Sequence, residues 1–156
     1  MIDPARALSH VARLAPVGTR HALSPDTGDD RGAMAAARWL EGQFKAIATA
    51  SQRDLRVEVE TFEAPPMARL PKGARLANVV AVLPGKDPAA AKRAYYVVGH
   101  YDSRNADALD GAGDAPGAND DASGVAVVLE CATALAQAAP LDATVVFLCT
   151  SGEEAG

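Results

Sequence analysis

Residues 95–99 have the sequence YYVVG, residues 125–135 have VAVVLECATAL, and residues 143–149 have ATVVFLC. The first and third runs are short and almost continuously apolar, which is typical of strands buried on both faces of a sheet. In the second run apolar residues recur at steps of three and four, as on one face of a helix, with Glu130 off that face. A strand, a helix and a second strand in this order form a βαβ unit with parallel strands. This stretch predicts an α/β fold.

The sequence before this unit adds helices and strands to the prediction. Residues 4–14 have helical spacing, and so do residues 30–47, for which Asp30 is the expected N-cap. Residues 55–60 alternate between apolar and charged side chains, which indicates an antiparallel strand near a sheet edge. A further apolar run, residues 75–83, ends at a Pro-Gly turn signal. We expect a three-layer αβα sandwich with a mixed, mainly parallel sheet that is incomplete at its C-terminal side.

The composition excludes several classes of function. The 156 residues carry 15 Lys and Arg against 20 Asp and Glu, a net charge of −5, and no basic stripe of the kind that binds nucleic acid. The sequence shows no apolar run long enough to cross a membrane and no apolar signal-peptide core at its N-terminus. We therefore expect neither a nucleic-acid nor a membrane partner. The compartment stays open, with the cytoplasm as the default and a secreted or periplasmic location as alternatives.

Acidic residues and a histidine gather where ligands bind in this architecture. Ligands of open α/β sheets lie beyond the carboxyl ends of the strands. His100 and Asp102 follow one predicted strand, Glu153 and Glu154 follow another, and Asp120 precedes the helix between them. We expect these three segments to converge on one edge of the sheet.

These residue types suit a metal centre. An imidazole with carboxylates is a ligand set for zinc, and Asp102, two residues from His100, can hold the tautomer of the ring from behind. A carboxylate can also bridge two cations, and a two-metal site can activate water for hydrolysis. Because Glu153 and Glu154 are adjacent, their side chains should diverge, so that one binds metal and the other accepts a proton from water.

Three motifs resemble those of the co-catalytic zinc aminopeptidase family, whose members include bacterial leucyl aminopeptidase, glutamate carboxypeptidase II and glutaminyl cyclase. The motifs are HYDS at 100–103, PGANDDASGVA at 116–126 and SGEEAG at 151–156. Their order and spacing fit the family, and the resemblance covers essentially the whole chain. It implies that residues 1–156 are the N-terminal part of a single zinc peptidase domain. The implied activity is that of a zinc-dependent exopeptidase of the aminopeptidase type, acting on peptides with a free N-terminus.

The resemblance also implies a role for each candidate residue. His100 and Glu154 would bind one zinc ion, and Asp120 would bridge this ion to a second one. Glu153 would be the general base that activates a metal-bound water, and Asp102 would support His100. The family also implies a cis peptide bond after Asp120.

Part of the family's ligand set is absent from the sequence. The family uses a further aspartate and a histidine that follow the Glu-Glu motif, whereas the chain stops at Gly156. His10 and His21 lie near the N-terminal helices, and we do not expect them to be substitute ligands. We therefore expect a truncated form of a longer peptidase, with one partial zinc site; an in-frame continuation of the coding sequence that supplies an Asp and a His would confirm it.

Other interpretations stay open. One is an inactive binding module, since the transferrin receptor ectodomain shows that the family fold can lose its metals; another is a glutaminyl-cyclase-like acyl transferase. Aminoacylases and desuccinylases share the His-x-Asp and Glu-Glu patterns, but residues 117–124 favour the aminopeptidases. A calcium loop at Asp107, Asp110 and Asp114 lacks EF-hand spacing, and a serine hydrolase lacks its Gly-x-Ser-x-Gly elbow.

Overall fold

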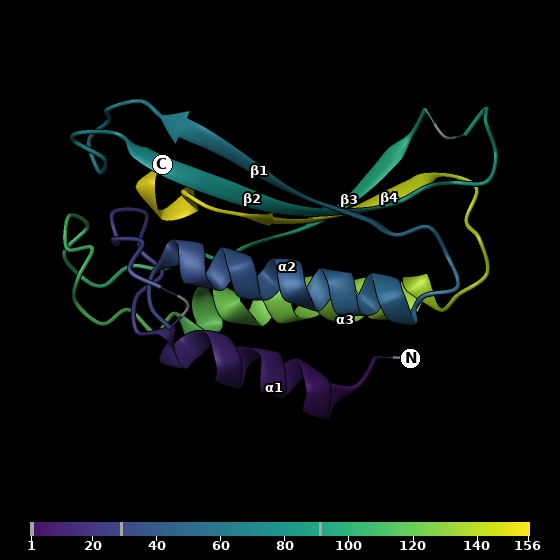
Figure 1. Cartoon of the computed structure of the whole chain (residues 1–156), viewed down its shortest axis with the longest axis horizontal. Coiled ribbons are helices and arrows are strands. Elements are labelled where there is room, and N and C mark those ends of the chain that lie inside the picture. Colours follow the sequence, from purple (N-terminus) through teal and green to yellow (C-terminus); the bar gives the residue numbers. More distant parts are fainter. Residues whose placement is uncertain (1, 29, 91) are drawn as a thin grey trace.

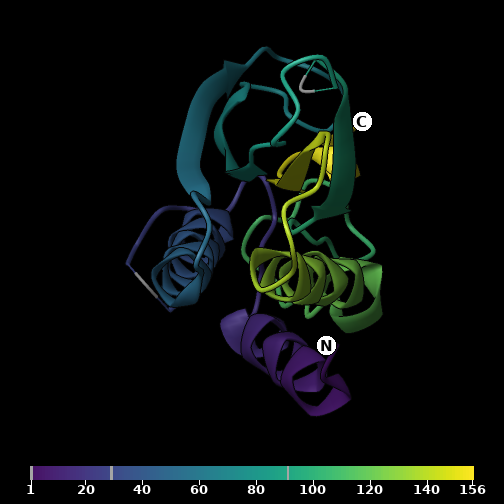
Figure 2. The same cartoon turned by 90° about the vertical axis from the view of Figure 1, so that its right-hand side faces the viewer.

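The computed structural model of the chain describes residues 2–28, 30–90 and 92–156. A four-stranded sheet lies against two helices, α2 and α3, which run side by side under one of its faces (Figures 1 and 2). The first helix, α1, packs on the far side of α3. In chain order the helices and strands are α1 (Pro4–Leu14), α2 (Ala33–Ala50), β1 (Arg56–Ala64), β2 (Ala74–Leu83), β3 (Ala94–His100), α3 (Ser123–Ala136) and β4 (Thr144–Thr150).

The strands lie in the order β1-β2-β4-β3. β3 and β4 are parallel, with Val97 opposite Phe147 and His100 opposite Thr150. The predicted βαβ unit is therefore confirmed, and so is the antiparallel edge strand, β1. Since the ends of β3 and β4 are in register, the residues that follow them meet at one edge of the sheet.

The α/β class and the mixed sheet are confirmed, but the described part of the chain differs from the expected sandwich in its proportions. Only β3 and β4 pair in parallel here, because only they are joined by a helical crossover, whereas β1–β2 and β2–β4 are antiparallel. The helices of this part cover one face of the sheet alone (Figure 2).

The hydrophobic core lies between the sheet and the helices α2 and α3. It contains Leu40 and Phe44 of α2, Val125 and Leu129 of α3, and inward residues of the strands such as Phe147, all with no exposed surface. Because side chains alternate along a strand, their neighbours point to the opposite face of the sheet. The core therefore explains both apolar patterns of the sequence: every second residue in the strands, and steps of three and four in the helices.

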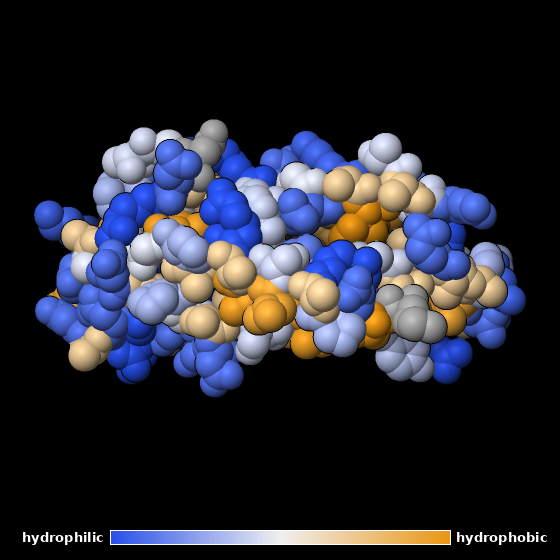
Figure 3. All heavy atoms as spheres, turned by 90° about the horizontal axis from the view of Figure 1, so that it is seen from below, coloured by the Kyte–Doolittle hydropathy of each residue, from blue (hydrophilic) through white to orange (hydrophobic). Residues whose placement is uncertain are grey.

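The two faces of the molecule differ in polarity. Seen from the side of α1, the surface is mostly hydrophilic, with apolar residues in small groups (Figure 3). On the opposite face of the sheet, Tyr96 is 62% exposed and Val98 is 54% exposed. The expectation that β3 is buried on both faces is thus wrong for the described residues, because no helix of this part covers its outer side. Among the described residues, no helix is long and apolar enough to span a membrane.

The helix starts show how local and distant residues satisfy free N–H groups. The predicted helix at 4–14 is confirmed, and the Asp3 carboxylate caps it by accepting the N–H of Ala5 at 2.9 Å. Asp30 is not the N-cap of α2, which begins at Ala33. Instead the hydroxyl of Ser24 accepts the N–H of Ala33 at 2.8 Å. A residue nine positions upstream provides the cap because the preceding loop folds back over the helix start.

A buried carboxylate joins α1 to α3. Glu130 is only 1% exposed because α1 covers it, although it lies off the sheet-facing side of α3. Its oxygens accept Arg6 Nε at 2.6 Å, Arg6 Nη2 at 2.8 Å and the N–H of Asp3 at 2.8 Å. Burial by itself would raise the pKa of Glu130, but these hydrogen bonds and the charge of Arg6 hold it below its usual value.

We predict that Glu130→Gln lowers the free energy of unfolding at neutral pH by about 1–3 kcal/mol, because charge-assisted hydrogen bonds to a buried carboxylate are lost. The pKa of Glu130 is lower in the folded protein than in the unfolded chain. Its stabilisation is therefore complete above the unfolded pKa and is lost as pH falls through the folded one. Urea denaturation of both proteins from pH 7 to pH 3 measures the difference.

Glu41→Gln is the matched control. Glu41 forms an i,i+4 pair with Lys45 on the surface of α2, and such pairs contribute less than about 0.5 kcal/mol. A Glu130→Gln protein as stable as wild type at neutral pH would contradict this account of the α1–α3 contact.

Candidate metal centre

The three predicted segments converge at the carboxyl ends of β3 and β4. His100 is the last residue of β3, and Glu153 lies in the short turn after β4. His100 Nε2 is 3.0 Å from Asp120 Oδ1 and 3.8 Å from Glu153 Oε2. Residues separated by up to 53 positions are thus brought into one cluster by the parallel register of the two strands.

Asp102 lies behind the imidazole of His100. The Nδ1 atom of His100 faces the carbonyl oxygen of Asp102 at 3.3 Å and its Oδ1 at 3.6 Å. Because Nε2 faces Asp120 Oδ1 at 3.0 Å, oxygen atoms that can accept a hydrogen bond lie beside both ring nitrogens. Burial lowers the pKa of His100, but the surrounding carboxylates, with Asp102 first, raise it above its usual value overall.

Asp102 also binds the turn after β4. Its carboxylate has no exposed surface and accepts the N–H of Glu153 at 3.3 Å and that of Glu154 at 3.1 Å. Burial raises the pKa of Asp102, and these hydrogen bonds and His100 oppose that rise. One buried side chain therefore positions the imidazole and both glutamates.

The start of α3 presents Asp120 to the histidine. The peptide bond between Asp120 and Asp121 is cis, as expected from the sequence. Asp121 accepts the N–H of His100 at 3.2 Å and that of Gly124 at 2.9 Å, which joins β3 to the first turn of α3. A Cβ atom on Gly124 would lie 2.3 Å from Asp121 Oδ1, so this turn requires glycine. The side chain of Asp120 stays 74% exposed beside His100.

Glu154 lies in a different environment from the other candidates. Its Oε2 accepts Arg104 Nε at 2.7 Å, and its carbonyl oxygen accepts Arg69 Nη1 at 2.8 Å. In the part of the chain that the structure describes, no group of three His, Cys, Asp or Glu side chains forms a complete metal site. The structure brings His100, Asp120 and Glu153 together, while the role of Glu154 as a ligand stays a prediction.

The donors at the centre fit zinc in their chemistry. The Nε2 atom of His100 lies beside a carboxylate oxygen of Asp120, and the opposite ring nitrogen faces two oxygens of Asp102. This arrangement is typical of zinc-binding histidines, whose second nitrogen donates to a carboxylate or a carbonyl group. The two nearest candidates, His100 and Asp120, would contribute ligands to the same ion.

The other histidines and the acidic loop are engaged elsewhere. His21 Nδ1 accepts the N–H of Leu23, and its Nε2 lies 3.2 Å from the carbonyl oxygen of Ala108. The carboxylate of Asp110 accepts the N–H groups of Ala112 and Gly113 and so caps a turn. An aspartate side chain that accepts nearby backbone N–H groups stabilises a turn, so Asp110 has a structural role in this loop.

Sequence reasoning missed Arg20. Its side chain is completely buried and donates hydrogen bonds only to backbone carbonyl groups of four residues. These are Tyr101 at 2.6 Å, Leu14 and Gly117 at 2.9 Å, and Pro116 at 2.8 Å. A single arginine in a loop carries no periodic or motif signal, so only the folded chain reveals it.

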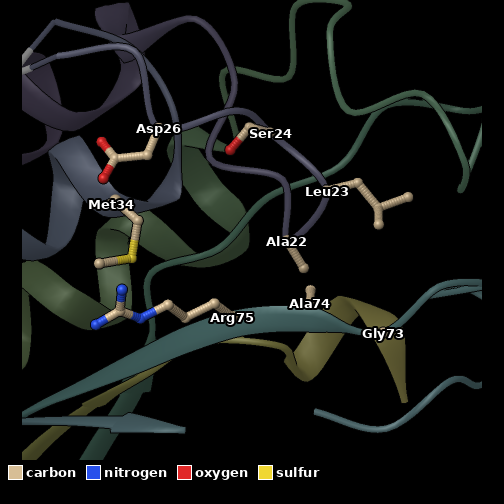
Figure 4. Close-up of a pocket in the computed structure, with 8 residues that line it drawn as sticks. All are labelled: Ala22, Leu23, Ser24, Asp26, Met34, Gly73, Ala74 and Arg75. Carbon is tan, nitrogen blue, oxygen red and sulfur yellow. The ribbon is translucent and has the colours of Figure 1, made fainter. Parts of the chain in front are cut away.

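The structure also contains a cavity of about 330 Å³ between the loop at 22–26, the start of α2 and the start of β2. In Figure 4 the side chain of Arg75 lies below Met34, and Asp26 lies above Met34. None of the five candidate site residues lines this cavity. It is therefore separate from the proposed metal centre.

Residues 78–156 match peptidase family M28, and the chain belongs to this family. The recognition made from the three sequence motifs is thereby confirmed.

Two curated relatives illustrate the similarity. A Pyricularia oryzae protein named "Probable zinc metalloprotease" is 42% identical over 156 residues, which cover 99% of this chain and 30% of that protein. A Pyrenophora teres f. teres protein with the same name is 44% identical over 151 residues, covering 95% of this chain and 32% of that one. The chain thus spans about a third of the length of these relatives.

Solved structures share the fold. Porphyromonas gingivalis glutaminyl cyclase matches with a TM-score of 0.73 at 22% identity, over 98% of this chain and 46% of that one. A leucine aminopeptidase precursor from Bacteroides thetaiotaomicron matches with a TM-score of 0.73 at 21% identity, over 98% and 48%. At these identities the likeness shows the fold alone.

We predict that Asp102→Asn weakens zinc binding by about 10- to 100-fold, the usual effect of losing a partner behind a metal ligand. The amide keeps one acceptor oxygen, so in either orientation its NH2 group faces the backbone N–H of Glu153 or that of Glu154, which are themselves donors. Competition with a chromophoric chelator, on the whole protein that contains this chain, measures the affinity.

Asp54→Asn serves as the control, because Asp54 pairs with Arg56 on the surface and has no link to the centre. Equal zinc affinities of the Asp102→Asn and Asp54→Asn proteins would contradict a supporting role for Asp102.

Proposed function

We propose that this chain is the N-terminal part of a single zinc peptidase domain, and that the protein is an exopeptidase of the aminopeptidase type. The substrate class would be peptides with a free N-terminus. The observation that carries the proposal is the imidazole of His100, which lies between Asp102 on its Nδ1 side and Asp120, 3.0 Å from Nε2. Membership in peptidase family M28 supports it.

The ligand roles follow from these positions. His100 and Asp120 would hold zinc directly, and Asp120 is the candidate for bridging two ions because its carboxylate is largely exposed at the site edge. Glu154 would complete the set of the His100 ion by exchanging its contact with Arg104 for the metal. When bound, zinc acts as a Lewis acid that polarises a substrate carbonyl group and lowers the pKa of water.

Glu153 is the proposed general base and, later, general acid. Its side chain is 61% exposed and lies next to His100, so it can reach both water and substrate. Its backbone N–H is bound by the buried Asp102, which keeps the carboxylate at the edge of the centre while the side chain stays free to move a proton.

A second candidate is acyl transfer of the glutaminyl cyclase type, favoured by the structural likeness to the Porphyromonas gingivalis enzyme. The sequence relatives at about 40% identity carry zinc metalloprotease names, which favours the peptidase. An aminoacyl anilide and a peptide with N-terminal glutamine, offered separately, distinguish hydrolysis from cyclisation.

We predict that Glu153→Gln retains zinc but lowers the rate of aminoacyl anilide hydrolysis at least about 100-fold, because general-base catalysis contributes about 10²–10⁴ in rate. Metal analysis and an anilide assay on the whole protein containing this chain measure both quantities. Glu58→Gln, an exposed position of the edge strand β1 opposite Val80, is the control and should leave both unchanged. A wild-type protein that holds no zinc would favour a non-catalytic binding module of the same fold.

A further inference from the structure

A buried positive charge lies directly behind the metal centre. The guanidinium of Arg20 has no exposed surface, and carbonyl oxygens surround it on three sides. Burial lowers the pKa of Arg20 to about 10, with the charges of Asp102 and Asp121 opposing the change, so the group stays protonated at neutral pH. A charged group is costly to bury, and an apolar side chain would fill the same space without that cost.

The carbonyl groups that Arg20 binds belong to the two segments that carry the site. Tyr101, bound through Nε at 2.6 Å, stands between His100 and Asp102. Gly117, bound through Nη2 at 2.9 Å, precedes the turn of Asp120 by three residues. A single planar group thus spans the end of β3 and the entry to α3, with its donors in a fixed geometry.

Ser103 forms a second connection between the same segments. Its hydroxyl accepts the N–H of Arg20 at 3.1 Å and donates to the carbonyl oxygen of Ala115 at 2.7 Å. Close packing adds to the constraint, because a Cβ atom on Gly117 would lie 2.8 Å from Arg20 Nη2. Arg20 and Ser103 thus connect the end of β3 to the segment before α3 through several hydrogen bonds.

We propose that Arg20 is a positioning residue that holds the His100 segment and the Asp120 segment at the separation needed for one zinc ion. This inference rests on the proposed function, since it concerns the same centre. Arg20 does not touch the ion or the substrate. It acts through the backbone at Tyr101 and Gly117. The buried guanidinium needs acceptors, so the carbonyl oxygens of these residues point toward it.

Zinc affinity of Arg20 variants of the whole protein that contains this chain tests the proposal, by competition with a chromophoric chelator. We expect Arg20→Met to bind zinc at least about 10-fold more weakly than wild type, in the range found for residues behind metal ligands. Arg20→Lys should also lose about 10-fold, because an ammonium group cannot reach carbonyl groups in a guanidinium geometry. Guanidinium ion added to Arg20→Ala should restore affinity at least in part.

Arg53→Met is the matched control. Arg53 also donates to backbone carbonyl groups, of Leu135 at 3.3 Å and Pro84 at 3.1 Å, but at the opposite end of the sheet. It should lose stability in urea while its zinc affinity stays that of wild type. A purely structural role for Arg20 would make the Arg20 and Arg53 variants alike, with zinc affinity unchanged wherever circular dichroism shows a folded protein.

The outcomes separate this inference from the proposed function. If wild type binds zinc and the folded Arg20→Met protein binds it equally well, Arg20 does not position the centre, whereas the zinc site stands. If Arg20→Met does not fold, Arg20→Lys decides, and wild-type affinity in that variant overturns the proposal. If wild type itself binds no zinc, both the proposed function and the role of Arg20 are wrong.

Discussion

The buried carboxylate of Asp102 joins the end of β3 to the turn after β4, and the geometry of the candidate centre depends on it. Its oxygens accept the N–H groups of Glu153 and Glu154, and one of them faces Nδ1 of His100 at 3.6 Å. A carboxylate without exposed surface is stable only when such donors replace water. The same contacts that satisfy this charge therefore align the imidazole with the two glutamates. A small change in the register of β3 against β4 would disrupt all of them together.

Buried charge recurs at two further positions, and in each case it connects elements distant in the chain. Glu130 binds α1 to α3 through Arg6, and Arg20 binds the end of α1 to the loops around the centre. The apolar core between the sheet and the helices α2 and α3 supplies the main driving force for folding. Hydrophobic contacts are not directional, whereas these hydrogen bonds fix angles and distances. The core thus assembles the layers, and the buried ions determine how the loops at the strand ends are placed.

Much of the fold was predictable because it depends on local periodicity. The helix at 4–14, the edge strand β1 and the βαβ unit follow from spacing that one element imposes on its own residues. Sequence reasoning failed where distant residues intervene. Ser24 caps α2 in place of Asp30, and α1 buries Glu130, which its own helix places off the apolar face. Arg20 carried no signal at all, since its four partners lie between 6 and 97 positions away.

The sequence alone determined the family, the α/β class and the identity of the candidate residues, because motif spacing and apolar periodicity are properties of neighbouring residues. It also determined that His100, Asp120 and Glu153 would meet, since parallel strands bring their carboxyl ends to one edge. Only the tertiary structure decided that Asp102 accepts the N–H groups of Glu153 and Glu154, and that Glu154 contacts Arg104. These features arise from hydrogen bonds between segments about 50 residues apart, and their geometry exists only once the strands are paired.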